Sequence, residues 1–200
     1  MKSAIKQTTA PTKPSPSSQP LVIGIGSPHG DDRAGWEVVE RLRAMDLRFA
    51  SNRLHKAAVP HDALDWFDPQ TTTHLVDAIA IHSDRLLRFE LARDPQGNLQ
   101  TLLTDQDQGR HPVAFPALRS HSTHQFDLRS VLELAAALNT LPRRIVLWAI
   151  PIEINATPTG TLDWSATDSN VQQIAALPHA TLERHIQHAV QRIAHEIAHA

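Results

Sequence analysis

The sequence contains neither cysteine nor tyrosine, and each absence excludes some chemistry. Without cysteine, the chain has no disulfide, no thiol nucleophile, no iron–sulfur ligand and no cysteine-type zinc site. Without tyrosine, no phenol serves as acid or nucleophile. A chain free of cysteine is typical of a reducing compartment, so we expect a cytoplasmic protein.

Excess charge and long apolar runs are also missing. The formal net charge is -2 at pH 7, which predicts no nucleic-acid partner. No apolar run reaches the roughly 20 residues of a transmembrane helix, so we expect no membrane insertion. Residues 1–19 are basic and rich in Ser, Thr and Pro, which predicts a disordered leader and not a signal peptide. Residues 20–200 are long enough for a single domain with a full core.

Apolar runs alternate with amphipathic stretches in the predicted domain. The runs predict strands at residues 21–25, 52–59, 72–78, 86–91 and 144–150. The amphipathic stretches predict helices at 34–42, 127–138 (with Leu138 on the apolar face) and 180–200. Residues 104–123 lack periodicity and carry prolines and histidines, which predicts an exposed loop. The pattern indicates a three-layer α/β/α fold of the phosphorylase/hydrolase-like kind, with a mainly parallel twisted sheet and helices on both faces.

Functional side chains in such a sheet lie beyond the carboxyl ends of the strands. That rule selects the turn at 27–33, the end of the third strand at Asp77, and the loops near 120–124 and 151–155. Two acids and a histidine meeting there would form an oxygen- and nitrogen-rich site for a divalent metal. Each residue also has a purely structural interpretation: acids favour helix starts, Asp77 can cap a helix, and His124 is one of 13 histidines.

Two further motifs suggest other functions. Glycines at 24, 26 and 30 follow the first strand as in a phosphate-binding loop, but Asp31 and Asp32 would repel a pyrophosphate at that helix start. The segment His195-Glu196-Ile197-Ala198-His199 matches the HExxH zinc-protease pattern. Its helix has an apolar stripe through Ile186, Val190, Ile193 and Ile197, and both histidines point roughly 160° away from it. We therefore expect a solvated face with weak affinity for metal at most.

Four segments together resemble the maturation proteases of [NiFe]-hydrogenases. These are GIGSPHGDDRAGWEVVERL at the first strand, HLVDAIAI at the third, HSTHQFDLRSVLELAAAL before the second long helix, and RRIVLWAIPIE at the last strand. Their order and spacing agree with the family over about residues 20–155. The resemblance implies an endopeptidase that removes a C-terminal peptide from a hydrogenase large-subunit precursor after nickel insertion.

The same resemblance assigns roles to individual residues. The second acid of the opening turn, the aspartate of the third strand and the histidine of the Ser-x-His segment are Asp32, Asp77 and His124. In the family these contact nickel carried by the precursor, so the three are the expected catalytic and metal-contacting residues, with nickel belonging to the substrate. A metal at this place would polarise the scissile carbonyl or activate a water.

The chain departs from the family pattern in three places, one of which is the absence of a Pro-Gly after the Asp-Ala of the third strand, where Ser83-Asp84-Arg85 lies nearby. Ser27 replaces an asparagine, and Lys56-Ala57-Ala58-Val59 replaces a glycine-rich segment that begins with an acid. The missing acid motivates an alternative hypothesis, in which the chain binds nickel or the precursor as a maturation chaperone without cutting it.

Overall fold

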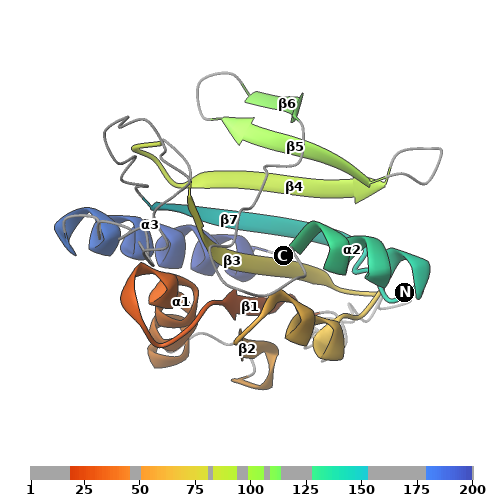
Figure 1. Ribbon diagram of the computed structural model, residues 1–200, viewed down its shortest axis with the longest axis horizontal. Helices are drawn as coiled ribbons and strands as arrows, with labels where there is room; N and C mark the ends of the chain where they lie inside the picture. Colours follow the sequence, from red (N-terminus) through yellow and green to blue (C-terminus); the bar gives the residue numbers. More distant parts are fainter. Residues whose placement is uncertain are drawn as a thin grey trace, which may run out of the picture.

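A seven-stranded sheet forms the middle layer of the computed structural model (Figure 1). The structure describes residues 19–45, 51–80, 83–93, 99–105, 109–113, 128–152 and 179–199. In chain order the strands are β1 (Leu21–Ile25), β2 (Leu54–Ala57), β3 (Thr72–Ala80), β4 (Leu87–Arg93), β5 (Leu99–Asp105), β6 (Gly109–Val113) and β7 (Arg144–Ile152). Their order in the sheet is β2-β1-β3-β7-β4-β5-β6.

The sheet has a parallel half and an antiparallel half, which meet at β7. Strands β2, β1, β3 and β7 run parallel, whereas β4 is antiparallel to β7 and to β5, and β5 is antiparallel to β6. The parallel strands β1 and β7 are buried along almost their whole length. Strands covered on both faces need such continuous apolar runs.

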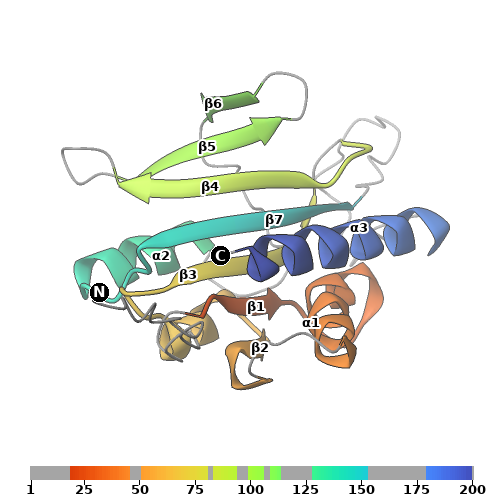
Figure 2. The same ribbon diagram turned by 180° about the vertical axis from the view of Figure 1, so that it is seen from behind.

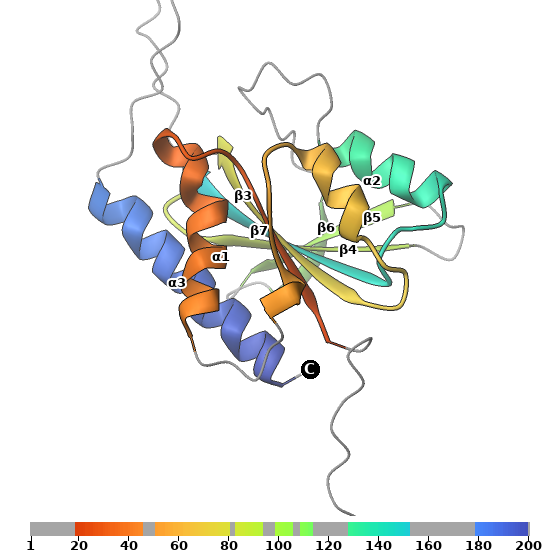
Figure 3. The same cartoon turned by 90° about the horizontal axis from the view of Figure 1, so that it is seen from below.

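Helices cover both faces of the parallel half (Figure 3). Helix α1 (Ala34–Ala44) and helix α3 (His179–Ala198) pack on one face, where they share a core with Val22, Val76 and Trp148. Helix α2 (Leu128–Ala137) and the 3-10 helix η4 (Pro60–Trp66) lie on the other face. Two further 3-10 turns, η2 (Gly30–Arg33) and η3 (Ser51–Arg53), precede α1 and β2. This three-layer arrangement confirms the predicted α/β class.

Three details of the prediction were wrong. Part of the predicted loop at 104–123 is sheet, because β5 continues to Asp105 and β6 occupies 109–113. Pro112 concealed β6, but a proline is compatible with an edge strand, where one side of the backbone needs no partner. Strand β5 as a whole was not predicted either, so the sheet, mainly parallel as expected, also has an antiparallel half. Leu138 lies beyond the end of α2 and is 59% exposed, so it is not part of the apolar face.

Other predictions fall on residues that the structure does not describe. The leader at 1–18, the remainder of the loop at 114–123 and the segment 153–155 belong to this group. No helix within the described ranges is long and apolar enough to cross a membrane.

Candidate functional site

Two glycines bring the start of α1 into backbone contact with the sheet. A Cβ atom on Gly35 would lie 2.6 Å from the carbonyl oxygen of Val76, and nearer still to that of Ile25. A Cβ atom on Gly24 would in turn meet the backbone of Gly35. Only glycine allows this approach, since real Cβ atoms essentially never come within 3.0 Å of such neighbours. The helix therefore starts directly against β1 and β3, and the turn before it lies over their carboxyl ends.

The turn itself folds back onto the end of β1. Gly26 has a φ of 147°, and a Cβ there would collide with the carbonyl group of Asp32. The amide of Gly26 donates to the carbonyl of Ala57 in β2 at 3.1 Å, which ties the turn to the neighbouring strand. The space beside Gly26 is thus filled by the main chain of Asp32 and leaves no cradle for a phosphate. This geometry speaks against the nucleotide-binding interpretation.

Asp77 lies within β3 and not at its end. The strand continues to Ala80, two residues further than predicted, because β7 pairs with it up to Ile152. On its other side, pairing with β1 ends at Val76, opposite Gly24. Asp77 is therefore placed where β1 leaves the sheet, and the residue as a whole is of intermediate exposure. The predicted position at the carboxyl edge is correct with respect to β1.

The two acids interact electrostatically. The pKa of Asp77 is raised from 3.8 to about 7, chiefly by burial and in addition by the negative charge of Asp32, whereas the hydrogen bond from the amide of Ala78 acts in the opposite direction. Asp32 itself is exposed. No ion pair to either carboxylate occurs among the residues that the structure describes. Two like charges that lack a cationic partner form a place where a cation would be stabilised.

The structure brings together two of the three predicted site residues. His124 lies outside the described residues. Helix α2 begins four positions later, at Leu128, and leads into β7. Helix α2 packs on the face of the sheet to which Asp77 belongs. Residues two apart in a strand share a face, so Asp77 lies on the same face as Leu75 and Ile79, and both of these are in the core beneath α2. Within the described ranges, no three His, Asp or Glu side chains gather into a metal-binding group.

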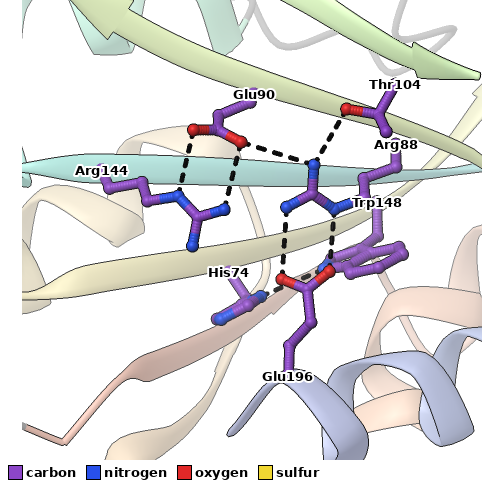
Figure 4. A network of polar contacts seen from close by, with 7 residues as sticks. All are labelled: His74, Arg88, Glu90, Thr104, Arg144, Trp148 and Glu196. Atoms are coloured by element: carbon purple, nitrogen blue, oxygen red, sulfur yellow. Dashed lines mark hydrogen bonds and ion pairs between the residues drawn. The ribbon is translucent and has the colours of Figure 1, made fainter. Parts of the chain in front are cut away.

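The HExxH segment does not form a zinc-protease site. Glu196, which would be the general base, makes a bidentate ion pair with Arg88 of β4, with Nε–Oε1 2.9 Å and Nη2–Oε2 3.2 Å (Figure 4). His195 and His199 are exposed, as their positions opposite the apolar stripe predicted. A carboxylate held by a guanidinium in this way is not available to activate water.

The polar network that contains Glu196 was not predicted from the sequence. Arg88 also contacts Glu90 and Thr104, and Glu90 accepts two hydrogen bonds of 3.1 Å from Arg144 (Figure 4). Below them, the indole of Trp148 donates to Nδ1 of His74 at 3.1 Å. The available signal was the alternation Arg88-Phe89-Glu90 in a predicted strand, which places two opposite charges on one face.

Fold and site together define a class: an α/β protein with a pair of unneutralised carboxylates at the carboxyl ends of its parallel strands. No protein-family model matches the chain, and no curated protein does either.

Solved structures similar to it include the hydrogenase maturating endopeptidase HybD from E. coli, with 17% identity, 88% of this chain and 89% of that one covered, and a TM-score of 0.49. The [NiFe] hydrogenase maturation protease HycI from Thermococcus kodakarensis KOD1 is 19% identical, with 92% and 94% covered and the same TM-score. The hydrogenase 2 maturation peptidase from Thaumarchaeota archaeon SCGC_AB-539-E09 is 17% identical, with 90% and 98% covered, again at 0.49. These structures carry the name of the family that the sequence motifs resemble. At such identities and TM-scores, the likeness assigns no activity to this chain.

Proposed function

We propose that the chain is an endopeptidase that removes a C-terminal peptide from a [NiFe]-hydrogenase large-subunit precursor once nickel has been inserted. In this proposal Asp32, Asp77 and His124 contact the nickel that the precursor carries. The nickel is part of the substrate, so cleavage depends on whether the precursor is loaded.

The observation that carries the proposal is the electrostatic pairing of Asp32 with Asp77. The two carboxylates come from separate elements, the turn before α1 and strand β3, and the charge of Asp32 raises the pKa of Asp77 although their positions in the chain differ by 45. They occupy the sheet edge where ligands bind in folds of this class. Four sequence segments in family order supply the reaction class.

His124 is the third contact in this proposal because of its place in the chain. It precedes α2 by four residues, and α2 lies on the same side of the sheet as Asp77. A neutral imidazole beside two carboxylates makes a mixed nitrogen and oxygen donor set, which suits a borderline divalent ion such as Ni²⁺.

The pairing also suggests how the site responds to its substrate. In the metal-free chain, Asp77 is about half protonated near neutral pH, since its pKa is about 7. A divalent ion reverses the local preference and favours the ionised carboxylate, so docking of a loaded precursor releases that proton. An unloaded precursor leaves the two like charges unrelieved. The site would then discriminate loaded from unloaded substrate through charge.

Cleavage of the cognate precursor tests the proposal directly. Nickel-loaded and nickel-free precursor are each incubated with the wild-type chain and with the variants Asp32→Ala, Asp77→Ala and His124→Ala. The masses of the products are then determined by mass spectrometry. We expect loss of a short C-terminal peptide from the loaded precursor alone, and at least a hundredfold slower cleavage with each variant, in the range typical of lost charge stabilisation.

Asp31→Ala is the matched control, because this acid is adjacent to Asp32 in the same turn and has no assigned contact with nickel. It should cut at close to the wild-type rate. Full activity of a folded His124→Ala protein would contradict the assignment of that residue. Tight binding of the loaded precursor without any product would replace the protease with the chaperone, for which Lys56-Ala57-Ala58-Val59 is the specific motivation.

A further inference from the structure

The exposed end of α3 carries two imidazoles that face each other. The rings of His195 and His199 have centroids 4.2 Å apart and are tilted by 38°. Both side chains are exposed, on the side of α3 away from the sheet. Residues four apart on a helix are neighbours on its surface, so this pairing follows from the helix itself.

One contact fixes which nitrogen of His199 can bind a metal. Its Nδ1 lies 2.7 Å from the carbonyl oxygen of His195. A carbonyl oxygen only accepts, so Nδ1 carries the hydrogen and the lone pair of the neutral ring resides on Nε2. Histidines that ligate metals commonly donate their second nitrogen to a backbone carbonyl in this way. The ring is thus held in the tautomer and orientation that a metal ligand needs.

The helix beneath the two rings is anchored on its other side. Glu196 lies between them in sequence and forms the bidentate pair with Arg88, which attaches this last turn of α3 to β4 (Figure 4). The whole helix α3 lies in front of the sheet in Figure 2. Ile193 is buried and Ile197 packs against the core. The turn that carries both histidines is therefore preformed, and binding a metal does not have to pay for folding it.

We propose that His195 and His199 form a second metal site, independent of Asp32 and Asp77, that binds Ni²⁺ or a similar borderline divalent ion through two imidazole nitrogens. An ion about 2.1 Å from one nitrogen of each ring would hold the two rings in adjacent coordination positions. No third protein ligand joins them within the described ranges, so water completes the coordination sphere. Imidazole ligands select nickel, copper and zinc over magnesium and calcium.

Open coordination positions give this site a different use from a structural metal centre. An ion with two protein ligands and several waters is accessible to ligands from another molecule, which can take it up without unfolding the helix. The site is built to acquire and release a metal at the surface.

Metal binding by the isolated chain, prepared without a polyhistidine tag, tests the site. Isothermal titration with Ni²⁺ is compared for the wild type, His195→Ala, His199→Ala and the control His61→Ala, which removes an exposed histidine of η4. Each variant of the pair should bind at least about tenfold more weakly, because the second ligand acts at a high effective concentration. His61→Ala should bind like the wild type.

A spectroscopic test identifies the ligands themselves. With one equivalent of Cu²⁺ as the probe, electron paramagnetic resonance should show two equivalent nitrogens in an Asp32→Ala background, and one or none once His199 is replaced. Unchanged affinity and unchanged nitrogen couplings in both His195→Ala and His199→Ala would overturn the proposal. Since no precursor is present, this result is independent of whether the chain is a protease.

Discussion

Two groups of charged side chains, on opposite faces of the sheet, are built on opposite principles. In the network of Figure 4, each carboxylate faces a guanidinium: Glu196 is paired with Arg88, and Glu90 with Arg144. At the sheet edge, Asp77 faces Asp32, and the pKa of Asp77 is raised to about 7. The carboxylates of the first group are largely buried and are neutralised by guanidinium groups, whereas the second group is left with an excess of negative charge.

The difference separates stability from function. A buried charge that loses its partner is costly, so the network commits β4, β7 and α3 to one arrangement. The acid pair lowers the stability of the folded chain, because the chain would be more stable if one of the two carboxylates carried no charge. Unrelieved repulsion of this kind is characteristic of sites that bind or react. The following substitutions test whether the two groups respond with opposite signs.

The largest expected effect comes from breaking the network at its centre. Arg88→Met leaves Glu196 and Glu90 without their shared cation and should lower the free energy of unfolding by about 3–5 kcal/mol. Urea denaturation at pH 7 measures it. Arg85→Met is the control, since Arg85 is 65% exposed and its ion pair with Asp84 spans 3.8 Å; such a surface pair contributes about 0–1 kcal/mol. Equal effects of the two substitutions would remove the distinction between the network and the surface.

The second effect tests the backbone contact that positions the acid pair. Gly35→Ala places a methyl group against the carbonyl oxygens of Ile25 and Val76, which cannot move without shifting β1 and β3. We expect a loss of about 1–3 kcal/mol, as for other overpacked sites, together with slower cleavage. Glu40→Ala, at an exposed position of the same helix, should cost less than about 1 kcal/mol. A Gly35→Ala protein of wild-type stability and activity would show that the close approach is dispensable.

A third effect lies in the pH dependence of the network. Burial lowers the pKa of His74 to about 4, whereas the unfolded chain protonates near 6.5. The unfolded state therefore takes up a proton first as the pH falls, and stability present above pH 6.5 is lost toward pH 4. The contribution of His74 should decrease by about 2 kcal/mol between pH 7 and pH 5. His74→Gln keeps an acceptor for Trp148 and should flatten this part of the curve; an unchanged slope would contradict the buried neutral imidazole.

The smallest effect should have the opposite sign. Asp77 ionises near pH 4 when unfolded and near pH 7 when folded, so its contribution to stability is complete below pH 4 and is lost as the pH rises to 7. Asp77→Asn should therefore raise the free energy of unfolding at pH 8 by about 1–2 kcal/mol and leave it unchanged at pH 4. Asp32→Asn should produce a smaller gain, because it removes only the repulsion. If Asp77→Asn instead destabilised the protein at pH 8, Asp77 would contribute to stability in the same way as the charged groups of the network.

The sequence predicted the parallel half of the fold better than the antiparallel half. Strands β1 and β7 are nearly continuous apolar runs, which are easily recognised in the sequence and are expected where both faces of a sheet are covered. Strand β6 was missed because an edge strand tolerates Pro112 and shows no clear alternation. The 3-10 helix η4 was missed as well, since seven residues give little periodicity.

For the candidate site, sequence reasoning selected Asp32 and Asp77 but could not predict the raised pKa of Asp77. Asp32 and Asp77 follow from the rule that ligands bind at the carboxyl ends of parallel strands. The influence of Asp32 on the pKa of Asp77 joins two elements that are distant in the sequence, and no local pattern reveals it. Partners far apart in sequence, such as Arg88 and Glu196, were equally out of reach, because each has an ordinary local role in its own strand or helix.

The glycine contact at the start of α1 also affects how freely this protein can diverge. Where a helix is positioned by interlocking side chains, each change in the core shifts it slightly, and a site at its end drifts with the packing. Here main chain rests on main chain, so the hydrophobic residues of α1 can be exchanged for others of similar volume without moving the turn that carries Asp32. Lineages can therefore lose most of their recognisable sequence while the spacing of the two acids persists. Gly24 and Gly35 would be among the last positions to change.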